Sequence, residues 1–211
     1  MSYIAMKYLA IDTSGKHLTV IANGKKLIVR HLSDCSLSHS IVLMDEIEFA
    51  FSEAGISLKD VDVLACAVGP GSFTGIRIGI ATVKAFSYAF KTKVLPVTSF
   101  ESLAYNISSK KRKLALISAR HGNYYACLFS EKNEPLSSPS FLNEEEIKAL
   151  IKKEKCVVIS DEETPFNSTV ADLKAGFYTA VEAKLNKAVE DRELLVPLYV
   201  KKSQAEEENG N

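Results

Sequence analysis

The chain has 211 residues, of which 46% are hydrophobic and 25% charged, and its 26 lysines and arginines balance 26 acidic residues. This composition is typical of a folded globular protein and excludes the polar, highly charged class of disordered chains. Zero net charge gives no general reason to bind phosphate backbones, so strong direct binding of nucleic acid is not expected.

The apolar segments and the cysteines exclude further classes. The longest apolar run, residues 63–68, is much shorter than the ~20 residues that span a bilayer. The N-terminal residues lack the continuous apolar core of a secretion signal. The cysteines, at positions 35, 66, 127 and 156, have no Cys-x-x-Cys spacing, which disfavours zinc ribbons and redox dithiols. We expect a cytoplasmic protein with reduced thiols and no membrane association.

The first half of the chain predicts the element order β-β-β-α-β-α-β-α. Asn23-Gly24 lies between two apolar runs and favours a hairpin, because both central residues of a type I′ turn need positive φ. Gly55 follows a helical pattern, where a left-handed residue readily ends a helix. We expect strands at residues 8–12, 18–22, 27–29, 61–68 and 94–97, and helices at 38–54, 76–90 and 99–107.

After a lysine-rich stretch at residues 110–113 the pattern changes, and a second, smaller lobe is predicted. Asn143 and Glu146 have the spacing of a capping box, which predicts a helix that runs to about residue 152. Strands are expected at 114–119, 124–129 and 156–160, a helix at 180–189 and a final extended segment at 194–200. The predicted division is an N-terminal lobe over residues 1–109, a C-terminal lobe over 110–202 and a disordered tail over 203–211.

Two glycine-bearing turns, each after a strand, are candidates for binding an anion. One is Asp12-Thr-Ser-Gly15, and the other runs from Gly69 to Gly75 and opens a helix. Backbone N–H groups in such turns can face an anion, and the dipole of a helix N-terminus favours negative charge. Alternatively, the glycines only permit tight turns and close packing of helix on sheet. Neither turn matches a Walker A loop or a Rossmann fingerprint. The candidate nucleotide or anion loop comprises Asp12, Thr13, Ser14, Gly69, Gly71 and Ser72.

No catalytic constellation is visible elsewhere in the sequence. The histidines, at positions 17, 31, 39 and 121, never pair at the helical spacings that a metal site would use. Ser72 lies in a glycine-rich turn without the Gly-x-Ser-x-Gly pattern of a nucleophile elbow. Thr98 and Glu101 fit a capping box, which explains the glutamate without catalysis. The residues therefore predict no catalytic group and no metal ligand.

Two helices carry more apolar surface than one sheet needs. On a helical wheel, residues 76–90 leave only Arg77 and Lys84 as a charged stripe, so this helix must be covered on two sides. The helix at 38–54 has a main apolar face that includes Met44, and a minor stripe nearly opposite. One interpretation is a two-helix surface for a partner; the other is that the sheet covers one side and the smaller lobe the other. The predicted dimer interface is Val42, Asp45, Phe49, Ile76, Ile78, Gly79, Ile80 and Val83.

Several segments resemble the bacterial TsaB family, also called YeaZ. They are Leu9-Ala-Ile-Asp-Thr-Ser14, Gly69-Pro-Gly-Ser-Phe-Thr-Gly-Ile-Arg-Ile-Gly79, Pro96-Val-Thr-Ser-Phe-Glu-Ser-Leu-Ala104, Ala119-Arg-His-Gly-Asn-Tyr-Tyr125 and Pro197-Leu-Tyr-Val200. The family often has Asp-Ala-Arg where this chain has Ser118-Ala-Arg120. The resemblance implies an α/β fold of the actin-like, sugar-kinase and Hsp70 superfamily (ASKHA, RNase H-like), with two lobes and a reduced second lobe.

The same resemblance implies a role in transfer-RNA modification. Family members pair with TsaD, which transfers threonylcarbamoyl to adenosine 37 of tRNAs that read ANN codons, while TsaC makes the threonylcarbamoyl-adenylate and the ATPase TsaE supports turnover. In TsaD, two histidines four residues apart hold the metal. Ser99 and Leu103 take their positions here, and leucine cannot ligate a metal. The resemblance implies a non-catalytic subunit without an intrinsic cofactor. It leaves open whether ATP or ADP binds at the boundary with TsaD.

Two functional hypotheses of different classes follow. The first is an interaction protein, not an enzyme, that pairs with TsaD through the two apolar helices, or forms a homodimer when TsaD is absent. The second is a stand-alone ATP-binding phosphotransferase or metallohydrolase of the same superfamily. In that case Asp12, Thr13 and the turn at residues 69–75 would hold phosphate and magnesium.

Overall fold

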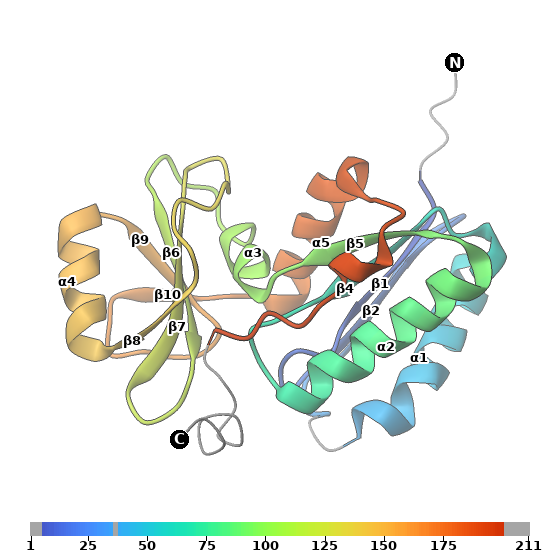
Figure 1. The fold of residues 1–211 in the computed structure, drawn as a ribbon, viewed down its shortest axis with the longest axis horizontal. Helices are drawn as coiled ribbons and strands as arrows, with labels where there is room; N and C mark the ends of the chain where they lie inside the picture. The colour runs from blue at the N-terminus through green and yellow to red at the C-terminus, as the bar shows by residue number, and fades with distance from the viewer. Residues whose placement is uncertain (1–5, 36–37, 201–211) are drawn as a thin grey trace.

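A computed structural model of the chain describes residues 6–35 and 38–200 (Figure 1). The tail predicted to be disordered, residues 203–211, lies outside these residues. The chain forms two five-stranded mixed sheets with helices packed on them. The predicted two-lobed α/β fold is therefore confirmed. Within the described ranges, every helix falls short of the length and hydropathy that a membrane crossing requires.

The first sheet has the strand order β3-β2-β1-β4-β5. Its strands are β1 (Tyr8–Asp12), β2 (Leu18–Asn23), β3 (Leu27–Leu32), β4 (Val63–Ala67) and β5 (Lys93–Val97). β1 to β3 form an antiparallel meander, and β4 and β5 run parallel to β1. β1 and β4 are buried at every position, which explains why their sequences are continuous apolar runs. The predicted element order of this half is confirmed.

Helices cover both faces of this sheet (Figure 1). α1 (His39–Ala54) and α2 (Phe73–Phe90) pack on one face, and the short 3-10 turn η1 (Leu58–Asp60) precedes β4. The other face is covered by α5 (Leu173–Lys184), which comes from the far end of the chain and buries Phe177, Ala180 and Val181. The predicted helix at 180–189 is wrong in its bounds, because Asp172 caps a helix that begins at Leu173.

The hairpin between β2 and β3 forms with a different turn from the one predicted. Asn23 pairs with Leu27, so three residues connect the strands instead of two. Lys25 N donates to Ala54 O at the end of α1 (2.9 Å). A Cβ on Gly24 would lie 2.7 Å from the same carbonyl oxygen. Glycine is required here by the close approach of the hairpin to the end of α1.

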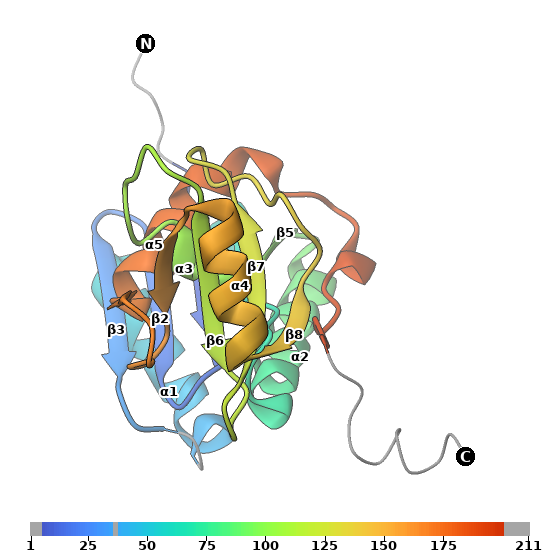
Figure 2. The ribbon, with the colours of Figure 1, turned by 90° about the vertical axis from the view of Figure 1, so that its left-hand side faces the viewer.

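The second sheet has the strand order β10-β9-β6-β7-β8. Its strands are β6 (Lys113–Ser118), β7 (Asn123–Phe129), β8 (Ser140–Asn143), β9 (Val157–Ser160) and β10 (Ser168–Val170). α4 (Glu144–Glu154) covers its outer face, as Figure 2 shows, and α3 (Ser99–Ala104) packs on its inner face. The edge strands β8 and β10 were not predicted, because they are short and half exposed and carry no apolar run.

α3 and α5 lie between the two sheets and join the lobes (Figure 1). A Cβ on Gly176 in α5 would lie 2.0 Å from Ser102 O in α3, so the two backbones are nearly in contact. At the C-terminal end of α5, Lys184 Nζ donates to Glu101 Oε1 of α3 (2.6 Å). The capping box predicted at Thr98 and Glu101 begins α3, and the one predicted at Asn143 and Glu146 begins α4.

The chain after α5 returns along the first lobe as a strap, residues 188–200, which includes the 3-10 turn η3 (Arg192–Leu194) and follows the turn η2 (Leu185–Lys187). Val189 pairs with Val94 of β5, Leu195 is buried in the first core, and Leu198 N donates to Val68 O (2.8 Å). Leu198 and Val200 pack against the core of the second lobe. The extended segment predicted at 194–200 therefore spans both lobes without joining a β-ladder.

The division into lobes at residue 109 stays a prediction. The close approach of α5 to α3, which joins the lobes, can be tested by adding a methyl group at Gly176. Helix propensity alone favours alanine over glycine by ~1 kcal/mol. We expect Gly176→Ala to lower the free energy of unfolding by about 1–3 kcal/mol instead, because the added methyl overpacks the contact with Ser102. Urea denaturation measures this, with Ala183→Ser on the exposed side of α5 as the control. A stabilised Gly176→Ala protein would contradict the close approach.

Candidate functional site

The two glycine-bearing turns meet at the carboxyl ends of β1 and β4. Ser72 N donates to Ser14 O (2.6 Å), and Thr13 Oγ1 donates to Gly75 O (2.7 Å). A Cβ on Gly71 would lie 2.1 Å from Ser14 O, and one on Gly75 would lie 2.0 Å from Thr13 O. These glycines therefore let two backbones touch, which was the structural alternative to anion binding.

The polar groups of the turns bond to one another. Asp12 Oδ1 accepts hydrogen bonds from Ser14 N (2.8 Å) and Ser14 Oγ (2.6 Å). Ser72 Oγ accepts from Gly75 N (3.2 Å), and Gly69 O accepts from Ser99 N (2.8 Å). Asp12, Thr13 and Ser14 are buried, whereas Gly71 and Ser72 are exposed. The structure thus brings the six predicted loop residues together, with their hydroxyls and the carboxylate engaged internally. Binding of nucleotide or anion there stays a prediction.

Asp12 also forms a buried ion pair that the sequence analysis missed. His17 Nε2 lies 3.2 Å from Asp12 Oδ2, and the backbone oxygen of His17 bonds with His39 Nε2 (2.8 Å). Burial by itself would raise the pKa of Asp12, but the His17 charge and the bonds from Ser14 lower it. Burial would likewise lower the pKa of His17, yet the Asp12 charge raises it. Each partner therefore favours the charged form of the other.

A second carboxylate reaches this region from the other lobe. Asp161, after β9, accepts a hydrogen bond from Ser118 N (3.0 Å), at the segment where the family often has an aspartate. Burial raises the pKa of Asp161 to about 6, and its charge acts on His17. The ring of His31 stacks on that of His17, with centroids 5.5 Å apart. Two carboxylates, those of Asp12 and Asp161, therefore act on the imidazole of His17 near the two turns.

Ser99 and Leu103, at the positions of the TsaD metal ligands, face different surroundings. Ser99 Oγ donates to Ser14 Oγ (3.2 Å), so it lies beside the two turns. Leu103 is buried in the core that α3 shares with the second sheet. Over the part of the chain that the structure describes, no three His, Cys, Asp or Glu side chains are grouped so that they could hold a metal ion.

The predicted interface on α1 and α2 is only partly at the surface. Four of its members, Ile76, Gly79, Ile80 and Val83, are buried, because they face the first sheet. This corrects their assignment as partner-facing residues of the free chain. Val42 and Ile78 are half-buried, while Asp45 and Phe49 are exposed. Whether the exposed members form a dimer interface stays a prediction.

Two exposed apolar side chains on the α2 side of α1 were not among the predicted interface residues. Ile41 is 74% exposed and Met44 is 51% exposed, although Met44 was placed on the core face. The ion pairs Lys26–Glu53 and Arg30–Glu46 join the opposite side of α1 to the β2–β3 hairpin. The buried face of α1, which packs Leu43, Ile47 and Ala50 into the first core, sets the rotation of the helix and leaves Ile41 and Met44 at the surface.

The outer flank of α2 is covered by the C-terminal strap. Arg192 Nε donates to Ser87 Oγ (2.9 Å), and Glu193 forms an ion pair with Lys84 (3.4 Å). Nearer the start of α2, the Arg77 guanidinium lies 3.7 Å from the centre of the Phe73 ring, and Arg77 Nε donates to Tyr199 Oη (2.9 Å). The strap, whose last part was predicted only as an extended segment at residues 194–200, therefore provides the second cover that the sequence analysis expected for α2.

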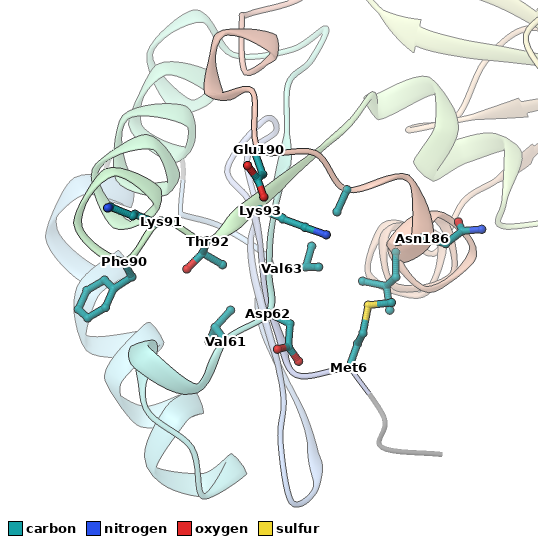
Figure 3. Close-up of a pocket in the computed structure, with 12 residues that line it drawn as sticks. Met6, Val61, Asp62, Val63, Phe90, Lys91, Thr92, Lys93, Asn186 and Glu190 are labelled. Atoms are coloured by element: carbon teal, nitrogen blue, oxygen red, sulfur yellow. The ribbon is translucent and has the colours of Figure 1, made fainter. Parts of the chain in front are cut away.

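A hollow of about 530 Å³ opens at the other end of the first sheet, where β4 and β5 begin (Figure 3). Asp62, Thr92, Lys93 and Glu190 line it together with the apolar side chain of Met6. Its walls mix both signs of charge. It lies at the opposite strand ends from the turns of Asp12 and Gly69, so it belongs to neither predicted site.

The fold and its two interlocked turns define a two-lobed α/β protein of the actin-like (ASKHA) class. The family described as "TsaD: tRNA N6-adenosine threonylcarbamoyltransferase" matches residues 33–158, more than half of the chain. Two solved structures from Pseudomonas aeruginosa share the fold. One is a protein with similarity to peptidase YEAZ (TM-score 0.76, 23% identity, 93% of this chain and 100% of that chain). The other is YeaZ (TM-score 0.75, 22% identity, 92% and 99%).

Curated relatives agree with these matches. One from Buchnera aphidicola subsp. Schizaphis graminum is 31% identical over 162 residues, which cover 72% of this chain and 77% of that protein. One from Escherichia coli (strain K12) is 31% identical over 123 residues, which cover 57% of this chain and 53% of the relative. Both are named tRNA threonylcarbamoyladenosine biosynthesis protein TsaB. The chain belongs to the TsaB (YeaZ) family.

The Asp12–His17 pair should make stability depend on pH in a defined direction. The pKa of His17 is raised above 6.5, so its contribution is complete below that pH and is lost as pH rises through the folded-state pKa. The pKa of Asp12 is lowered below 3.8, so its contribution is lost only in stronger acid. We expect His17→Gln to lower the free energy of unfolding by about 3 kcal/mol at pH 5.5 and by less at pH 8.5.

Urea denaturation at both pH values checks this prediction. The matched control is His121→Gln, because His121 is exposed. A loss of stability on His17→Gln that was equal at pH 5.5 and 8.5 would show that the pair is not ionised in the folded protein.

Proposed function

We propose that this chain acts in the cytoplasm as a non-catalytic subunit in the biosynthesis of tRNA threonylcarbamoyladenosine, and that it pairs with a TsaD protein. The observation that carries the pairing is the exposed apolar surface on α1 and α2, centred on Ile41 and Met44. The names of the curated relatives supply the pathway. TsaC would supply the activated threonylcarbamoyl group, and the ATPase TsaE would support turnover of the assembled complex.

The geometry of the two helices favours a helical partner. Ala81 and Ala85 are exposed on α2, and such small side chains allow another helix to approach closely. Ile78, half-buried on the same helix, lies next to this small-residue stripe. Ile41 and Met44 supply large apolar side chains, which lose exposed area when a partner covers them. The same surface would serve a homodimer when TsaD is absent, because a two-fold interface uses one patch twice.

The surroundings of Ser99 and Leu103 support leaving catalysis to the partner. Leu103 is 1% exposed and contributes to a hydrophobic core, so replacing it by a ligand would disturb the packing of α3. Ser99 bonds with Ser14 in the interlocked turns. The chain is accordingly proposed to bring no metal or cofactor of its own. A nucleotide at the boundary with TsaD is compatible with this role.

The pairing surface can be tested with a charge at its centre. We expect Met44→Glu, and separately Ala81→Glu, to weaken pairing with TsaD and self-association at least tenfold, because an unpaired carboxylate would lose its water on assembly. Size-exclusion chromatography with light scattering measures both. Val170→Glu is the control, since Val170 is 48% exposed on the distant edge strand β10. Ile80 is unsuitable for this test because it is buried in the core. Unchanged assembly of both variants would contradict the surface.

The pathway assignment can be tested by reconstitution. We expect TsaC, TsaD and TsaE to modify an unmodified tRNA substrate efficiently only when this chain is added, as measured by incorporation of labelled threonine. Adding Met44→Glu protein should restore little activity, and Val170→Glu protein should restore full activity. Equal modification with and without the chain would refute the proposed function.

A further inference from the structure

The charges of the second lobe are separated between its two ends. Three segments meet at one end, which we call the basic end: the loop at residues 108–112 before β6, the turn at 130–135 after β7, and the last turn of α4 with the residues that follow it, 152–156. These three segments carry six lysines and one arginine. The opposite end, nearer to His17, carries Asp161, Glu162 and the three glutamates that begin α4.

Backbone contacts fix the three segments of the basic end against one another. Val157 N donates to Arg112 O (2.9 Å), which joins the loop before β6 to the segment after α4. Lys113 pairs with Phe129 across the β6–β7 ladder. The buried Lys113 ammonium also bonds with Ala104 O and with the side chain of Asn133 in the turn after β7. The basic end is therefore a defined surface built on the sheet.

The positive charge of this surface exceeds what local carboxylates neutralise. Glu154 pairs with Arg112 and Lys153, and Glu131 and Glu134 are the other acidic residues of the three segments. Within the described part of the chain, the remaining lysines of the surface form no ion pair. The exposed cations are Lys110, Lys111, Arg112, Lys132, Lys152, Lys153 and Lys155.

The side-chain chemistry favours a phosphate backbone over a protein partner. Lysine is depleted at the centres of protein interfaces, which need aromatic or aliphatic anchors. The three segments include no exposed aromatic residue. Flexible lysine ammonium groups suit phosphates spaced along a polymer, and they read no base sequence. Several separate loops supply them, which suits an extended polyanion more than one small anion.

We propose that the basic end of the second lobe contacts the phosphate backbone of the tRNA while the partner acts on it. This inference rests on the proposed function, which supplies the RNA. The zero net charge of the chain is consistent with it, because the acidic end balances the basic one and the surface acts locally. A handful of phosphate contacts gives weak binding that depends steeply on salt. The surface would orient RNA in the complex and not hold it alone.

The test compares two quadruple variants with the same change in net charge. In the first, Lys110, Lys111, Lys132 and Lys155 are replaced by glutamine. In the second, the matched control, the replaced residues are exposed lysines outside the basic end: Lys16, Lys25, Lys59 and Lys187. Fluorescence anisotropy measures binding of labelled, unmodified tRNA to each full-length chain, alone and together with TsaD, from 50 to 200 mM potassium chloride. Circular dichroism and thermal melting verify that both variants fold.

We expect the basic-end variant to bind tRNA about tenfold more weakly near 100 mM salt, with the slope of log K against log salt reduced by about 3, and the control to match the wild type. Equal losses in both variants would reduce the effect to net charge and overturn the proposal. So would an unchanged basic-end variant, or a wild-type chain that adds no tRNA affinity to TsaD. Loss of TsaD binding with unchanged tRNA affinity would make the surface a protein contact instead. If tRNA modification by TsaC, TsaD and TsaE still requires the chain while any of these results is found, the proposed function stands and only the tRNA contact is overturned.

Discussion

The backbone contact between the turn at residues 12–15 and the start of α2 is the constraint on which the first lobe depends. Three glycines of one segment face Thr13 and Ser14: Gly71 and Gly75 oppose their carbonyl oxygens, and a Cβ on Gly79 would lie 2.6 Å from Thr13 Oγ1. No side chain fits between these backbones. The contact therefore fixes both the position and the rotation of α2.

The rotation of α2 decides which of its apolar residues belong to the core and which remain for a partner. With Gly75 and Gly79 against β1, residues such as Ile76 and Val83 must face the sheet, and the small side chains of Ala81 and Ala85 must face outward. The strap then covers the flank that carries Lys84 and Ser87. The exposed small side chains of α2 are left on the side toward α1. The same geometry thus explains why the two turns are in backbone contact and why part of α2 stays exposed.

Sequence reasoning predicted features that depend on neighbours in the chain. The buried runs of β1 and β4, the capping boxes of α3 and α4 and the glycine that ends α1 were all recognisable, because each rests on local chemistry. It failed where the position of a side chain depends on contacts that its neighbours in the chain do not reveal. Met44 was assigned to the core, but the packing of α1 on the first sheet leaves it 51% exposed. The Asp12–His17 pair was invisible, because the ends of two antiparallel strands bring together residues that match no motif spacing.

The return of the C-terminal segment to the first sheet has a consequence for synthesis of the protein. Phe177 and Leu195 complete the two cores on either face of a sheet whose first strand begins at Tyr8. Residues as far along the chain as Leu195 must therefore be synthesised before both faces of that sheet can be fully covered. Such long-range closure slows folding relative to locally connected folds. The first lobe is therefore completed by residues that the ribosome adds after those of the second sheet.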